Sequence, residues 1–272
     1  MENALEMRYE KEALVVQANE LIRGLQDDYS LLEAKLIRLA ISQISMEDTD
    51  LKTYTCRITD LASFLEIPQD NIYRDIEQTV DSLMKKVITI KDKSRKPKKN
   101  GEYPWKKFHW VDTCYYNSGI ITLKMSSELK PYLLGLNYLF TEYGYEHILK
   151  LPTSYSIRLY ELLVSYRNII NPYSASFKPT NLFPHIQKQD NELIFSIEYL
   201  KNYFNCANKY AQDRDFVKWV IKSSVNAINN KTPDSAIKVS YRTAKEGRSI
   251  GYVLFKINAW EDEDFRAFIM KE

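Results

Sequence analysis

The type of fold is indicated most clearly by residues 208–260, which read NKYAQDRDFVKWVIKSSVNAINNKTPDSAIKVSYRTAKEGRSIGYVLFKINAW. In the first half, apolar residues recur at helical spacing, at positions 216, 217, 220, 221, 225 and 228. Arg214, Lys218 and Lys222 stand four residues apart and therefore share a different face. After residue 234 the period changes to two, and a second apolar run covers 252–257. The stretch predicts an amphipathic helix with a basic face, followed by a β-hairpin.

The turn between the two predicted strands is also basic, since residues 244–248 read AKEGR. A helix with a basic face followed by a hairpin with a basic tip is the plan of a winged helix. In that plan the helix enters a DNA groove and the hairpin lies against the neighbouring backbone. The candidate DNA-binding residues are Arg214, Lys218 and Lys222 on the groove side of the helix, and Lys209, Arg242, Lys245 and Arg248 toward the phosphates.

The same order of elements is predicted earlier in the chain. Ser30 and Glu33 have the spacing of a capping box that opens a helix, and Tyr54–Ile58 reads as a strand. A short helix at 61–65, capped by Thr59-Asp60, and a longer helix at 71–86 then form a helix-turn-helix pattern. Helix, strand, helix, helix and hairpin thus occur at about 30–125 and again at 154–257.

This repetition predicts an α+β chain with two tandem winged-helix domains. We expect the first domain at residues 1–143, the second at 144–260, and an acidic tail at 261–272.

The wing of the first domain is predicted to carry a long basic loop. Residues 91–107 contain 8 basic and 2 acidic side chains between a strand at 87–90 and a single strand at 106–116, and another strand follows at 120–124. A purely solubilising loop is the alternative, but its position directly after a helix-turn-helix favours contact with DNA. The candidates in this domain are Asn71, Arg74 and Gln78 on the helix, and Lys93, Arg95, Lys96, Lys98 and Lys99 in the loop.

We expect the helix of the first domain to bind DNA less strongly than the basic helix of the second domain. It also carries Asp75, Glu77 and Asp81, which phosphates repel. The net charge of the whole chain is only +2, yet residues 201–256 hold 11 basic and 4 acidic side chains. Local patches of this kind can bind a polyanion despite a nearly neutral total.

The sequence offers no catalytic, metal or cofactor motif. His109, His147 and His185 are isolated, no phosphate-binding Gly-rich motif is present, and the chain has only 7 Gly residues. The acidic clusters at 47–50 and 261–264 read as solvated surface. The 3 cysteines form no pair of metal-ligand spacing, which fits a reducing cytoplasm, and no apolar run is long enough to span a membrane.

Three stretches together resemble the Rep_3 family of plasmid replication initiators, the iteron-binding type. They are Leu14–Ile22, the helix 154–163 that reads SYSIRLYELL, and the turn Ala244–Arg248 followed by Val253–Phe255. The resemblance covers about residues 12–258. The acidic tail after Trp260 and the loop at 91–107 have no counterpart in the family pattern.

The resemblance implies two winged-helix domains that bind repeated double-stranded sites, called iterons, at a plasmid origin, with the helix 215–229 as the main recognition helix. It also implies melting of adjacent AT-rich DNA and recruitment of a host initiator ATPase and the replicative helicase. Family dimers repress their own gene, and the first domain supplies much of the dimer contact. No cofactor and no membrane partner are implied.

Two other functions remain open from the residues. One is a winged-helix transcriptional regulator, which would protect a single operator rather than several direct repeats. The other is a nicking or polymerising enzyme. The sequence does not support this function with a set of carboxylates that could bind a metal ion.

Overall fold

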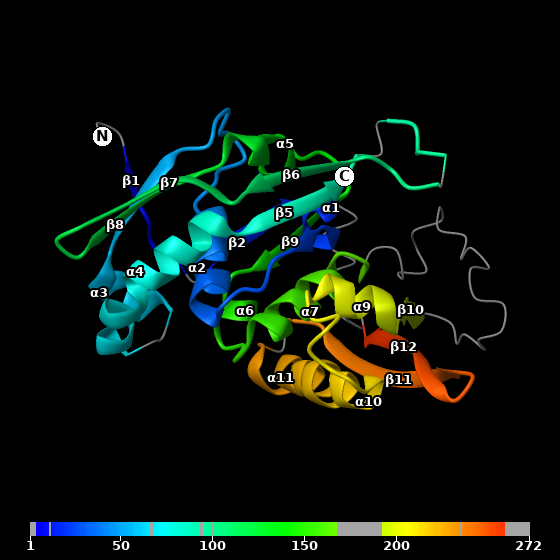
Figure 1. Cartoon of the computed structure of the whole chain (residues 1–272). Coiled ribbons are helices and arrows are strands. Elements are labelled where there is room, and N and C mark those ends of the chain that lie inside the picture. Colours follow the sequence, from blue (N-terminus) through cyan, green and yellow to red (C-terminus); the bar gives the residue numbers. More distant parts are fainter. Residues whose placement is uncertain are drawn as a thin grey trace, which may run out of the picture. The chain divides into compact units, whose positions relative to one another are not determined.

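The computed structural model describes residues 4–10, 12–65, 68–92, 95–99, 101–167, 192–233 and 236–258 (Figure 1). The chain divides into two compact units. Unit 1 comprises Met1–Ser154 and Tyr203–Asn205, and unit 2 comprises Tyr155–Asn202 and Cys206–Glu272. The predicted domain boundary after residue 143 falls inside a strand of unit 1, eleven residues before the end of its main segment.

The described elements of the first unit are β1 (Leu5–Glu6), β2 (Leu14–Ala18), α1 (Asn19–Arg23), β3 (Leu25–Gln26), α2 (Leu31–Ile41), β4 (Thr53–Arg57), α3 (Ile58–Phe64), α4 (Gln69–Lys85), β5 (Val87–Lys91), β6 (Trp105–His109), β7 (Val111–Asn117), β8 (Ile120–Met125), η1 (Ser127–Leu129), α5 (Lys130–Leu133), β9 (Phe140–Gly144) and α6 (Glu146–Leu149). Those that follow are α7 (Ser154–Val164), β10 (Glu192–Ser196), α9 (Ile197–Tyr203), α10 (Asp213–Phe216), the π-helical segment η2 (Val217–Lys222), α11 (Ser223–Lys231), β11 (Lys238–Glu246) and β12 (Ser249–Asn258).

The predicted capping box opens α2. The Ser30 hydroxyl accepts a hydrogen bond from the Glu33 backbone N–H at 3.1 Å, and the Ser30 backbone N–H donates to the Glu33 carboxylate at 2.6 Å. Two backbone N–H groups that the helix leaves unpaired are satisfied in this way. The side chains of α2 then pack into the core of the first unit, where Leu36 and Leu39 are almost fully buried.

A buried aromatic and cationic cluster lies beside α2. Trp110 is fully buried, and its indole N–H donates to the Tyr29 hydroxyl at 2.5 Å. The Arg38 guanidinium is also fully buried and lies 5.9 Å from the Tyr29 ring centroid and 5.7 Å from that of Trp110. These rings help to compensate the charge that burial removes from water.

Two sheets of the same topology confirm the repeated winged-helix pattern. In the second unit the strand order is β10-β12-β11, and in the first unit the order β4-β8-β7 is extended by β1. In each case the strand before the helix pair, β4 or β10, pairs antiparallel with the last strand of the hairpin, β8 or β12. The α+β class and the two winged-helix domains are therefore as predicted.

The predicted wing of the first domain is wrong. The hairpin that joins the winged-helix sheet is β7–β8, with a turn at Ser118 and Gly119, where φ is positive at both residues. The basic loop instead connects β5 and β6, which form a separate sheet in the order β3-β5-β6. Figure 1 shows the two hairpins extending toward opposite sides of the unit.

Two local predictions also fail in the first unit. The predicted strand 106–116 is broken at Trp110 into β6 and β7, because the two halves pair with different strands, β5 and β8. The short helix α3 begins at Ile58, before Thr59-Asp60, and no side chain caps it.

The last strand of the first unit extends it beyond the predicted boundary. β9 pairs antiparallel with β2, from Leu14 opposite Gly144 to Ala18 opposite Phe140. The Thr141 hydroxyl also donates to the Asn19 side-chain oxygen at 2.5 Å. Segments at both ends of this unit are thus joined in one two-stranded sheet.

Candidate nucleic-acid interface

A helix with one buried and one exposed side follows α9 in the second unit. It runs through α10, η2 and α11 without a break, since the residues at both joints keep helical backbone angles. Phe216, Val220 and Ile221 are fully buried on its inner side. The exposed side chains are Arg214, Lys218, Trp219, Lys222, Ser223, Asn226, Asn230 and Lys231.

The three basic residues predicted to face the groove are all exposed on this helix. Arg214 donates to the Gln212 side-chain oxygen at 2.9 Å and lies 4.0 Å from the Asp215 carboxylate. The Lys218 ammonium lies 4.5 Å from the centroid of the Trp219 ring. These contacts lie at the surface, so a polyanion could displace them at small cost.

The wing of the second unit presents two further cations. Lys245 and Arg248 are exposed at the tip of the β11–β12 hairpin. Gly247 between them has φ of 62°, a backbone region that glycine adopts without strain. The pairing register shifts between Ala244 and Lys245, so the hairpin carries a bulge just before its tip.

Arg242 lies in the same hairpin, but its guanidinium has a partner inside the protein. It donates two hydrogen bonds of 2.7 Å to the two carboxylate oxygens of Glu192 on β10. The Glu192 side chain is only 4% exposed, and its hydrogen bonds raise the pKa of Arg242. Contact between Arg242 and a phosphate stays a prediction, and it would have to compete with this pair.

Lys209 precedes the helix and contacts Tyr155 near the start of α7. Its ammonium donates to the Tyr155 hydroxyl at 3.2 Å and lies 5.8 Å from the centre of the ring. The side chain of Lys209 is exposed.

The corresponding helix of the first unit, α4, has a mixed surface. Asn71, Arg74 and Gln78 are exposed as predicted, and so are Glu77 and Asp81. Arg74 donates to both carboxylate oxygens of Asp75, at 2.7 and 2.9 Å. This pairing raises the pKa of Arg74 and lowers that of Asp75. The structure therefore presents little unbalanced positive charge on this helix.

In the basic loop between β5 and β6, four of the five residues predicted to contact DNA lie within the described residues. Arg95, Lys96, Lys98 and Lys99 are exposed, and Lys93 lies outside the described residues. Arg95 is paired with Asp92 at 3.0 Å. A turn is closed by hydrogen bonds from the Gly101 N–H to the Lys98 carbonyl and from the Lys98 N–H to the Glu102 carbonyl.

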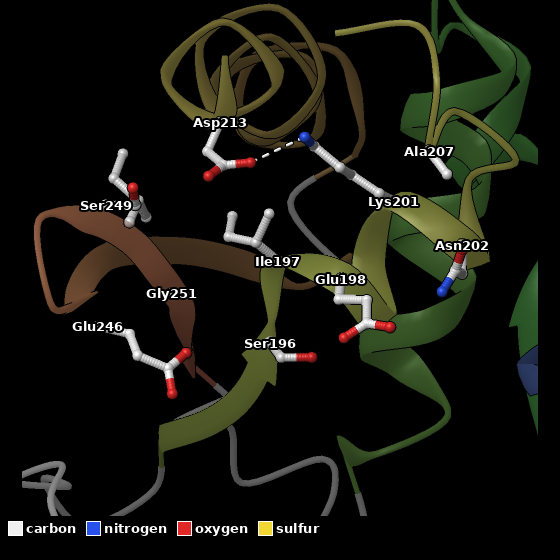
Figure 2. A pocket seen from close by; sticks show the side chains of 11 residues that line it. Ser196, Ile197, Glu198, Lys201, Asn202, Ala207, Asp213, Glu246, Ser249 and Gly251 are labelled. Atoms are coloured by element: carbon white, nitrogen blue, oxygen red, sulfur yellow. Dashed lines mark hydrogen bonds and ion pairs between the residues drawn. The ribbon is translucent and has the colours of Figure 1, made fainter. Parts of the chain in front are cut away.

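The hollow beside the second wing does not suit an anion. A cavity of about 390 Å³ is lined by Glu198, Lys201, Asp213 and Glu246, together with Ser196 and Ser249 (Figure 2). The one lysine among these residues is paired with Asp213 at 2.8 Å. Two further carboxylates remain, so the charge of this cavity disfavours a phosphate. The candidate interface is therefore the exposed side of the helix together with the wing tip.

Trp219 is an exposed residue of the candidate interface that sequence reasoning missed. Its side chain is 60% exposed, between Lys218 and Lys222 in the chain. One signal was available, because position 219 falls outside the arc covered by the apolar positions 216, 217, 220, 221, 225 and 228. An apolar residue off the buried stripe of a helix is a candidate for contact with a partner.

The described part of the chain has no group of three or more His, Cys, Asp or Glu residues that could hold a metal ion. Within the same residues, no helix is both long and apolar enough to cross a membrane.

Comparisons with known proteins agree with this architecture. Residues 14–164 match the family described as Initiator Replication protein, WH1, and residues 196–257 match the one described as Initiator Rep protein, WH2. A replication initiation protein of Escherichia coli is 23% identical over 250 residues, which cover 90% of this chain and 70% of that protein. The crystal structure of the Pi initiator protein in complex with iteron DNA superimposes with a TM-score of 0.63 at 20% identity, over 93% of this chain and 100% of that one.

Proposed function

Because the chain belongs to the replication initiator family whose WH1 and WH2 domains it carries, we propose that it binds repeated double-stranded DNA sites at a plasmid origin and initiates replication there. Recognition by such a protein divides into base contacts, which carry specificity, and phosphate contacts, which position the protein.

The observation that carries this proposal is the exposed basic side of the helix 213–231 beside a wing with a basic tip. Arg214, Lys218 and Lys222 point outward from a helix whose other side is held by buried apolar residues. A helix fits the major groove, where an Arg side chain can donate two hydrogen bonds to a guanine. Lys245 and Arg248 then contact phosphates beside the groove.

The first domain makes the weaker contribution in this proposal. Acidic side chains offset the charge of α4, so its Asn71 and Gln78 contact DNA with little electrostatic attraction. The β5–β6 loop, which lies apart from the wing, supplies phosphate contacts through Lys96, Lys98 and Lys99.

Footprinting on the DNA that flanks the gene tests the proposed function. An initiator is expected to protect several direct repeats, separated by about one or two helical turns. Protection of a single inverted operator, with no repeats, would support the transcriptional regulator instead. A supercoiled plasmid that carries the repeats should also show enhanced permanganate reactivity in adjacent AT-rich DNA when the protein is added.

Two substitutions separate the reading of bases from the binding of phosphates. Arg214→Ala is expected to weaken binding to the repeats by about 1–3 kcal/mol, with a smaller effect on scrambled DNA. Lys98→Ala is expected to weaken both by similar factors and to reduce the slope of log affinity against log salt by about 0.9. Equal losses on both DNAs for Arg214→Ala would remove Arg214 from the base-reading set.

The remaining parts of the proposal are supported by family membership. We infer that the protein recruits a host initiator ATPase and the replicative helicase, acts in the cytoplasm, and represses its own gene as a dimer. The protein itself has no catalytic role in this account. Incubation with supercoiled origin DNA and Mg²⁺ is therefore expected to leave the DNA unnicked, whereas a nicked product would contradict a non-enzymatic role.

A further inference from the structure

The largest apolar side chain on the exposed side of the helix 213–231 is Trp219. Its 60% exposure contrasts with Phe216 and Val220, which are fully buried in the same helix. Among the described residues from Tyr155 onward, Trp219 is also the only large hydrophobic side chain that is exposed. A side chain of this kind leaves apolar surface in water unless a partner covers it.

The local backbone and one neighbour both favour an outward position for this ring. Trp219 lies in η2, where the helix widens to π geometry from Val217 to Lys222. Such short widenings change which side chains share a face and are frequent at functional sites. The Lys218 ammonium 4.5 Å from the ring centroid keeps a cation beside the indole, which is favourable for an approaching polyanion.

The chemistry of an indole matches one base edge in the major groove. Trp offers an apolar ring and a single N–H donor, with no acceptor. Thymine offers a C5-methyl group next to its O4 acceptor, whereas cytosine offers an N4 donor and no methyl group. An indole can therefore cover the methyl of thymine and donate to O4, while cytosine gives it neither contact.

We propose that Trp219 is a specificity-determining residue that reads a thymine through its methyl group and O4 in the major groove. The proposal rests on the proposed function, because it needs the helix 213–231 to lie in that groove. It adds an apolar contact to the Arg and Lys contacts of the same helix. Burial of one methyl group is expected to raise the affinity for DNA about fourfold.

The test uses the full chain and the duplex that it enriches most strongly from a random-sequence library. Each thymine in this duplex is replaced in turn by uracil, which removes only the methyl group and keeps O4. The wild-type protein is expected to lose about fourfold in affinity at one thymine of each site. At that position, replacement of the pair by 5-methylcytosine–guanine then keeps the methyl group and removes the acceptor.

Three variants assign this loss to Trp219. Trp219→Ala should abolish the thymine-to-uracil difference and lower affinity on the order of tenfold. Trp219→Phe should keep the difference in affinity between the thymine and uracil duplexes. On the 5-methylcytosine duplex, this variant should lose less affinity than the wild type does. Trp105→Ala is the matched control, since Trp105 is 57% exposed with the Lys107 ammonium 4.8 Å from its ring centroid, and it should keep the full difference. Thermal unfolding checks that each variant is folded.

The outcomes distinguish a failure of the thymine contact from a failure of the proposed function. If the wild type binds its enriched duplex tightly and Trp219→Ala retains the uracil effect at every thymine, the role of Trp219 is overturned and the proposed function stands. If the wild type enriches no sequence and binds scrambled DNA equally well, both are overturned. Loss of the uracil effect in Trp219→Ala, with retention in Trp105→Ala, establishes the thymine contact.

Discussion

Single side chains of the second wing divide into those that hold the hairpin and those that are available to DNA. Arg242 belongs to the first group, since it donates two hydrogen bonds to a carboxylate that is 4% exposed. We expect Arg242→Ala to lower the free energy of unfolding by about 1–3 kcal/mol, because the buried Glu192 carboxylate would lose two charge-assisted hydrogen bonds. Urea unfolding measures this loss.

Lys245→Ala, at an exposed position of the same strand, is the control and should change stability by less than about 0.5 kcal/mol. Glu192→Gln combined with Arg242→Ala should cost less than the sum of the two single changes, since either one already breaks the pair. Additive losses would contradict the assignment of Arg242 to a structural pair.

A buried thiol makes the stability of the first unit dependent on alkaline pH. Burial, with smaller effects of Asp60 and Glu6, raises the pKa of Cys56 from 9.0 to about 12. Between these values the native thiol keeps its proton while the unfolded one loses it, so stability should fall as pH rises above about 9. Urea unfolding from pH 7 to 10.5 measures the fall, and Cys56→Ala should make it shallower. An unchanged slope in this variant would contradict the shift.

At the scale of elements, the N-terminus of α2 should be sensitive to one hydroxyl. Ser30→Ala removes the acceptor for the Glu33 N–H and breaks the capping box, which should cost about 1 kcal/mol in the free energy of unfolding. Ser63→Ala, at an exposed position in α3, should have little effect. Equal unfolding midpoints for the two variants in urea would show that the cap contributes nothing.

Local sequence patterns predicted some helices and strands correctly and others wrongly. The capping box and the change of period after residue 234 were predictable, because both depend on residues a few positions apart. The identity of the first wing was not, since β8 is selected by β4, more than sixty residues earlier in the chain. Trp110 interrupts the apparent strand 106–116, and only the pairing of β6 with β5 and of β7 with β8 reveals that the two halves belong to different sheets.

The candidate site was predictable to the same extent. Helical spacing placed Arg214, Lys218 and Lys222 on the exposed side, where the structure has them. It could not show that Glu192, fifty residues away in the chain, holds the Arg242 guanidinium. Regular helical spacing also leaves Trp219 outside the apolar positions of this helix, but it could not show that the helix widens to π geometry from Val217 to Lys222.

At the scale of the whole molecule, each unit has its own buried core, with Trp110 in the first and Phe255 in the second. Amide exchange reports the free energy of local opening, so a substitution should act most strongly in the unit that holds it. Ser30→Ala is expected to speed exchange in α2 by about fivefold and to leave β10–β12 nearly unchanged, because a lost cap costs about 1 kcal/mol. Arg242→Ala should give the reverse pattern, measured by mass spectrometry of peptic fragments. Equal acceleration in both units for either variant would mean that the two cores open together, and the ion pair and the cap would then stabilise a single cooperative molecule.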